Sequence, residues 1–190
     1  WNAFKDQLLA DLYIATRYAL RIGLEHALNA ADIRRETRDM ALAKLMDAGF
    51  DADAIDALWA SFPEDAFLRY RPEQLVWQTQ GILAQAGAGT LVQVREFGGR
   101  DSLELFLRTP DRDGIFSGLM ATLDRLNLGV QHARLLAAND GQVLDNIIAT
   151  KGSHAPDAKR IGQTLLAALK DPASIRPAKH MLPRQLRHFK

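Results

Sequence analysis

Hydrophobic residues in the first half of the chain recur at the spacing of an amphipathic helix. Apolar positions three and four residues apart form one stripe from Phe4 to Leu24, and the same period returns over Ala31–Ala48 and Asp53–Ser61. Pro63 and Pro72 each stand where a further helix would begin, because the first helical position needs no backbone N–H. The first half of the chain is therefore predicted to be all-α.

The period changes to two after the small-residue stretch AQAGAGT at Ala84–Thr90. Gly98-Gly99 and Asn139-Asp140-Gly141 supply the turn chemistry of hairpins between alternating segments. The resulting order is β-α-β-β-α, with a further strand ahead of it or behind it. This split βαβ arrangement predicts an antiparallel sheet with two helices on one face. The predicted strands are 91–97, 102–109, 130–138 and 142–150, and the predicted helices are 115–126 and 156–169.

These patterns divide the chain into three predicted parts and give the fold class α+β. Residues 1–88 form an all-α helical region, and residues 90–170 form the sheet domain. Residues 171–190 are basic and contain three prolines, and we expect them to be a linker rather than a nucleic-acid-binding tail. Trp59 and Trp77 stand at helical spacing among apolar neighbours, so both are predicted to pack in a core.

Composition excludes several classes of protein. The 190 residues contain no cysteine, which excludes disulfides and thiolate chemistry, and a net charge of +1 argues against a protein that wraps nucleic acid. Apolar runs are too short to span a bilayer, and the N-terminus does not resemble a signal peptide. The chain begins with Trp1 rather than Met. We therefore expect a soluble, cytoplasmic piece of a longer protein.

Motifs for self-contained catalysis are missing from the sequence. The five histidines form no H-x-x-x-H pair, and the chain has no G-x-S-x-G, no phosphate-binding Gly-x-x-x-x-Gly-Lys and no G-x-G-x-x-G after a strand. We therefore predict no catalytic residue, no metal ligand and no cofactor site within this chain.

The loop in TPDRDGIFSGLMATLDRL, Thr109–Leu126, carries the strongest functional signal. Gly114 stands where strand turns into helix, and a residue without a side chain there lets a ligand approach the backbone. A helix N-terminus favours a carboxylate, and Asp111 could hold an ammonium, so the loop could bind a small amino acid. Alternatively, Asp111 or Asp113 simply caps the helix. The amides expected to face the ligand are those of Ile115, Phe116 and Ser117.

The same loop, followed by L-D-R-L-x-L and a D-G hairpin, resembles an ACT domain, a small-ligand regulatory module. Three helical and tail segments extend the resemblance to the family of bifunctional PII uridylyltransferase/uridylyl-removing enzymes. These segments are WNAFKDQLLADLYIAT, ALWASFPEDAFLRYRPEQLVWQTQ and LPRQLRHF. The chain is thus similar to the end of that family's hydrolase region followed by its first ACT domain.

The resemblance implies a ferredoxin-like βαββαβ domain that takes part in glutamine sensing. Glutamine would act as the allosteric effector, the PII signal protein would be the substrate of the full enzyme, and a second ACT domain or a homodimer mate would pack alongside. Mg²⁺ would be required only by catalytic domains outside this chain. The ACT ligand would lie between the loop and the second strand of the motif. The implied ligand-binding residues are Asp111, Asp113, Gly114, Ile115, Phe116, Gln131 and His132.

Two other functions fit parts of the pattern. A free-standing ACT module of a biosynthetic enzyme would bind an amino acid or dimerise without the catalytic domains. An RNA-binding sheet of the same topology would need aromatic residues on its two central strands, where the sequence offers only Phe106. We therefore expect neither nucleic acid nor membrane as a partner.

Overall fold

The computed structural model describes residues 12–13, 16, 30–85, 89–99 and 101–170. The predicted helix Phe4–Leu24 falls almost wholly outside the described residues, and the predicted linker 171–190 falls entirely outside them. The helical region contains α2 (Ala30–Asp47), α3 (Ala52–Trp59), α4 (Glu64–Arg69) and α5 (Pro72–Ala84). The sheet region contains β1 (Leu91–Glu96), β2 (Ser102–Pro110), α6 (Ile115–Arg125), β3 (Leu128–Ala137), β4 (Gln142–Lys151) and α7 (Ala158–Lys170).

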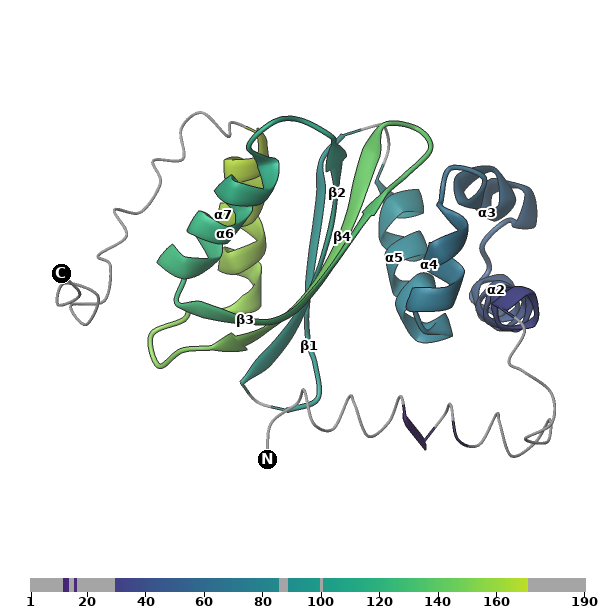
Figure 1. Ribbon diagram of the computed structural model, residues 1–190, viewed down its shortest axis with the longest axis horizontal. Coiled ribbons are helices and arrows are strands. Elements are labelled where there is room, and N and C mark those ends of the chain that lie inside the picture. Colours follow the sequence, from purple (N-terminus) through teal and green to yellow (C-terminus); the bar gives the residue numbers. More distant parts are fainter. Residues whose placement is uncertain (1–11, 14–15, 17–29, 86–88, 100, 171–190) are drawn as a thin grey trace, which may run out of the picture.

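The expected α+β class, with helices followed by an ACT-like sheet domain, is confirmed (Figure 1). The four strands are antiparallel and lie in the order β1-β2-β4-β3. Within the described part of the sheet region the element order is ββαββα. The further strand, whose place the sequence pattern left open, is therefore β1, ahead of the βαββα unit. It pairs with β2, Leu91 opposite Arg108, and forms one edge of the sheet.

Local sequence explains where the helices of the first region begin. The side chain of Asp51 accepts a hydrogen bond from the Ala54 amide at 2.9 Å and caps α3. Pro72 is the first residue of α5, as predicted. The prediction for Pro63 is wrong by one position: its backbone is extended and it precedes α4.

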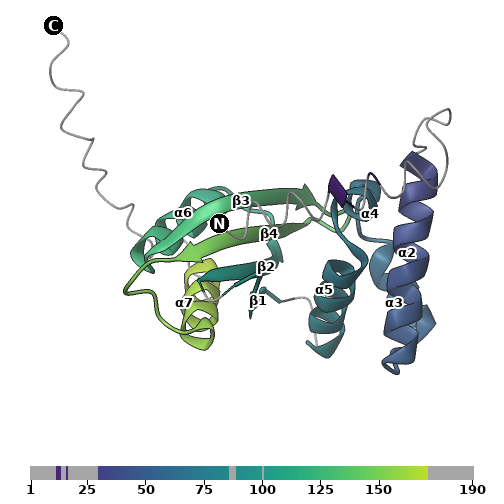
Figure 2. The ribbon, with the colours of Figure 1, turned by 90° about the horizontal axis from the view of Figure 1, so that it is seen from below.

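Helices α6 and α7 cover one face of the sheet, where the core is almost entirely aliphatic (Figures 1 and 2). Leucines at alternate positions of β2 point to this face and meet apolar residues of both helices. The buried members are Leu103, Leu105, Leu107, Ile115, Leu119, Leu123, Leu128, Ile147, Ala149, Ile161, Leu165 and Leu169.

The helical region covers the opposite face, which the sequence pattern did not predict (Figure 2). Phe106, Leu136 and Leu144 of the sheet share one buried cluster with α2–α5. Trp59 is fully buried at its centre, and Trp77 packs against Phe106 with ring centroids 6.4 Å apart, so both tryptophans pack in the core as predicted. The sheet is therefore the middle layer of a single stack, and β2 is buried on both faces. Among the described residues, no helix is both long and apolar enough to cross a membrane.

Candidate functional site

A pocket of about 460 Å³ lies at the junction of β2 and α6. Five of the predicted ligand-binding residues line it, all from the loop and the first turn of α6. Three further lining residues come from β3 and β4, and they had no signal in the sequence because only strand pairing brings them to the loop. The lining residues are Asp111, Arg112, Asp113, Gly114, Ile115, Phe116, Ser117, Leu135, Val143 and Asp145.

The N-terminus of α6 opens into this pocket without a side-chain cap. Gly114 is the N-cap residue and adopts φ +82°, a left-handed conformation that favours glycine. Neither Asp111 nor Asp113 caps the helix, so the capping interpretation is wrong. The Ile115 amide donates to the Arg112 carbonyl at 3.3 Å and is already used. In the described part of the chain the amides of Phe116 and Ser117 have no acceptor and can donate to a ligand.

Two hydrogen bonds hold the loop to the rest of the domain, and neither of them uses the loop's carboxylates. The Asp111 amide donates to the Gly141 carbonyl at 2.9 Å. The Arg112 guanidinium donates to the Leu169 carbonyl at 2.7 Å, at the end of α7. Arg112 also lines the pocket, but among the described residues it forms no ion pair with the pocket's acidic side chains.

Asp145 of β4 is the most perturbed group in the pocket. Its side chain is buried, and no hydrogen bond or ion pair reaches it from the described residues. Burial, followed by the charge of Asp111, raises the pKa of Asp145 to about 7. A buried carboxyl that lacks a donor beside a second carboxylate makes this end of the pocket favourable for a cation such as an ammonium.

Gln131 and His132, the other two predicted residues, do not line the pocket. The β3–β4 pairing shifts register between Val130 and His132, which makes Gln131 the extra residue of a β-bulge. His132 consequently pairs with Ile148 and shares its side of the strand with Leu136, which packs in the helical-region core. The bulge therefore turns His132 to the opposite face of the sheet. A single inserted position of this kind is not visible in the alternation of the sequence.

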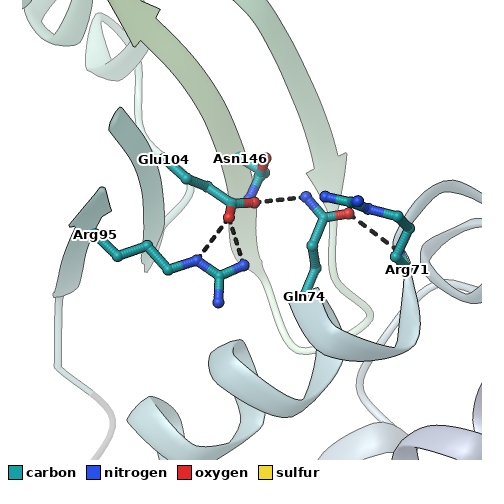
Figure 3. A network of polar contacts seen from close by, with 5 residues as sticks. All are labelled: Arg71, Gln74, Arg95, Glu104 and Asn146. Carbon is teal, nitrogen blue, oxygen red and sulfur yellow. Dashed lines mark hydrogen bonds and ion pairs between the residues drawn. The ribbon is translucent and has the colours of Figure 1, made fainter. Parts of the chain in front are cut away.

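A buried polar network joins the two halves of the chain on that opposite face (Figure 3). The Glu104 carboxylate is fully buried and accepts hydrogen bonds from Arg95 Nε at 2.7 Å, from Asn146 Nδ2 at 3.0 Å and from the Gln74 amide. Gln74 also accepts from the Arg71 amide at the start of α5. The Arg95 guanidinium lies 4.1 Å above the Trp77 ring. Every partner of Glu104 is thus internal, which marks this network as structural rather than as a ligand site.

The acidic residues near the pocket do not supply enough ligands for a metal site. Across the described residues, no group of three or more His, Cys, Asp or Glu side chains is placed to hold an ion. The pocket instead combines amide donors at one end with carboxylates at the other. This arrangement can bind a zwitterion, with its carboxylate at α6 and its ammonium beside Asp111 and Asp145.

Comparison with known proteins gives one consistent family. Residues 29–81, which span most of the helical region, match the family model described as the Uridylyltransferase GlnD fifth domain. The whole chain is 42% identical to bifunctional uridylyltransferase/uridylyl-removing enzymes of Xanthomonas campestris pv. campestris strain B100 and Xanthomonas axonopodis pv. citri strain 306. It is 34% identical, again over its full length, to the enzyme of that name from Aliivibrio fischeri strain MJ11. The chain spans 22% of the length of each of these relatives.

Proposed function

This chain belongs to the family of bifunctional uridylyltransferase/uridylyl-removing enzymes, and from that premise we propose that it is the family's regulatory, glutamine-sensing segment. In this proposal the full enzyme uridylylates and deuridylylates the PII signal protein in the cytoplasm and thereby controls nitrogen assimilation. The catalytic centres, with their Mg²⁺, belong to the remainder of that enzyme, and the present chain is a non-catalytic part.

The observation that carries the proposal is the pairing of opposite ligand-binding groups in one pocket. The uncapped amides of Phe116 and Ser117 suit the α-carboxylate of glutamine, while Asp111 and Asp145 suit its ammonium. An ammonium beside Asp145 would favour its charged form and so lower the pKa that burial, followed by the charge of Asp111, raises. Glutamine binding below about pH 7 should therefore release a proton, and affinity should rise as the pH increases through this range.

A second ACT domain or a second copy of the chain would complete the site. Phe116 and Leu135, which both line the pocket, are 46% and 48% exposed. An apolar neighbour over these side chains would enclose the ligand and strengthen its polar contacts by excluding water. Glutamine that stabilises one such arrangement more than another would shift the balance between the two activities by linkage.

The decisive experiment titrates glutamine into the full-length enzyme and measures the ratio of PII uridylylation to UMP removal. The expected result is a fall in that ratio as glutamine increases. Asp145→Asn should weaken the glutamine response at least about tenfold, because an amide cannot balance the ammonium charge. Asp124→Asn makes the same change on α6 outside the pocket lining and should leave the response unchanged.

Two results would contradict the proposal. A ratio that does not respond to glutamine in the unmodified enzyme would exclude glutamine sensing altogether. A response that is normal in Asp145→Asn would exclude this pocket while leaving the sensing function intact.

A further inference from the structure

A second hollow, of about 370 Å³, lies at the other end of the α6–α7 layer. It is formed where α6 ends, where the loop after β4 turns, and where α7 begins. The lining residues are Arg125, Leu126, His154, Pro156, Arg160 and Thr164. Three of these six carry basic side chains and none carries a carboxylate, so this basic hollow has the opposite charge character to the pocket at Gly114.

The arginines of the described residues show why the basic hollow is unusual. Six guanidiniums pair with a carboxylate, and three others contact a backbone carbonyl or an aromatic ring. The pairs are Arg34–Glu64, Arg35–Asp32, Arg38–Asp56, Arg69–Asp65, Arg95–Glu104 and Arg108–Asp140. The three others are Arg112 and Arg134, which donate to backbone carbonyls, and Arg71, which lies over the Phe97 ring.

Arg125 and Arg160 are the exceptions, and both line the basic hollow. Among the described residues, the Arg125 guanidinium donates only to the Thr122 hydroxyl, at 3.4 Å. For the Arg160 guanidinium the described part of the chain supplies no partner, although its backbone amide is capped by Asp157 at 2.8 Å. Neither guanidinium is paired with a carboxylate of the described residues. An anion placed between the two cations would be attracted by both.

The third basic group is His154, in the loop between β4 and α7. Its Nδ1 lies 2.9 Å from the Ser153 hydroxyl, which leaves Nε2 as the ring nitrogen that can face a ligand. The Thr164 hydroxyl already donates to the Arg160 carbonyl at 2.9 Å. The donors that remain are therefore two guanidiniums and an imidazole, a set that matches the several oxygens of a phosphate better than the two of a carboxylate.

We propose that the basic hollow is a binding site for a phosphate-bearing small molecule, held by Arg125, Arg160 and His154. The hollow has the size of a small-ligand site, and Leu126 and Pro156 give it an apolar wall beside the basic groups. The site is independent of the amino-acid pocket and of the function proposed for it. The shared chemistry is the phosphate, which inorganic phosphate or a nucleoside monophosphate can supply.

The test uses the 190-residue chain and follows the Arg125, Arg160 and His154 side-chain signals by NMR during separate titrations with inorganic phosphate and UMP. We expect saturable shifts in all three side chains. Arg125→Gln and Arg160→Gln should each weaken binding about tenfold, since each removes a charge-assisted hydrogen bond. Arg35→Gln, an equivalent loss of an exposed arginine outside the basic hollow, should leave the affinity unchanged.

The titrations distinguish a nucleotide from inorganic phosphate as the ligand, and they can contradict the proposed site. Tighter binding of UMP than of phosphate identifies a nucleotide site, and equal binding identifies a site for the phosphate group alone. Shifts that do not saturate with either probe would overturn the proposal. Equal weakening by Arg35→Gln would do the same, because it would show attraction to net positive charge rather than to this hollow. Unchanged thermal unfolding of the variants confirms that they are folded.

Discussion

In the part of the chain that the structure describes, each face of the sheet buries one acidic side chain, and the two acids have opposite surroundings. Glu104, on the face toward the helical region, is surrounded by donors from Arg95, Gln74 and Asn146. Asp145, on the face toward α6 and α7, is also buried but receives no donor from the described residues. The side chains of Glu104 and Asp145 are thus buried to a similar extent, and they differ in the hydrogen-bond donors that they receive from the described residues.

The difference separates a structural acid from the one that we propose binds a ligand. A buried carboxylate with complete hydrogen bonding holds its neighbours in one geometry, and Glu104 holds α5 against β1, β2 and β4 in this way. A buried carboxyl without donors costs stability unless something else supplies them, which is the usual condition of a ligand-binding group. The same replacement of acid by amide should consequently have opposite effects on stability at the two positions.

The largest expected effect is a gain in stability when Asp145 becomes Asn. The pKa of Asp145 is raised to about 7 in the folded chain, above the ordinary value of 3.8. The folded state therefore favours the protonated form, and the stabilisation is present below pH 3.8 and is lost as pH rises to about 7. At about pH 8, Asp145→Asn should be more stable than the unmodified chain, on the order of 3 kcal/mol.

Urea unfolding of the 190-residue chain at about pH 4 and about pH 8 checks this prediction. Asp145→Asn should remove most of the decrease in stability between the two pH values, whereas Asp124→Asn should retain it. A pH dependence that survives in Asp145→Asn would show that another group is responsible.

A loss of about 2 kcal/mol is expected for Glu104→Gln on the other face. The variant keeps the shape of the side chain but removes the charge that balances Arg95, whose side chain is only 31% exposed. Urea unfolding at neutral pH measures the change. Glu64→Gln is the matched control, because the Glu64 side chain is 83% exposed in its pair with Arg34 and its loss should cost less than about 1 kcal/mol. Equal costs in the two variants would contradict a special role for Glu104.

The smallest effect is expected from the loss of a hydrogen bond between uncharged groups, on the same face of the sheet as Glu104. The buried Tyr70 hydroxyl donates to the Leu144 carbonyl at 3.2 Å and links the end of α4 to β4. Burial, followed by the charge of Asp145, raises the pKa of Tyr70 well above its usual value, so the hydroxyl stays protonated as a donor. Tyr70→Phe should cost about 1 kcal/mol in urea unfolding, with no new dependence on pH below 9 or so. A cost near zero would show that this bond adds nothing to the attachment of the helical region.

Much of the fold and half of the site followed from local patterns. Leu103, Leu105 and Leu107 alternate because they face one core, and Gly114 stands where a left-handed residue begins α6. The loop that lines the pocket was predictable because its residues are contiguous. Asp145 was not, since β4 reaches the loop only through pairing with β2 and β3.

By itself, the sequence determined the secondary structure, the hairpin turns and the glycine-opened loop, since these depend on contacts between near neighbours. Only the tertiary structure decided that the helical region covers the second face of the sheet and that Glu104 finds three donors there. It also decided that a bulge at Gln131 turns His132 away from the pocket. These features depend on residues that are far apart in the chain. A short-range sequence pattern does not predict how such residues pair with one another.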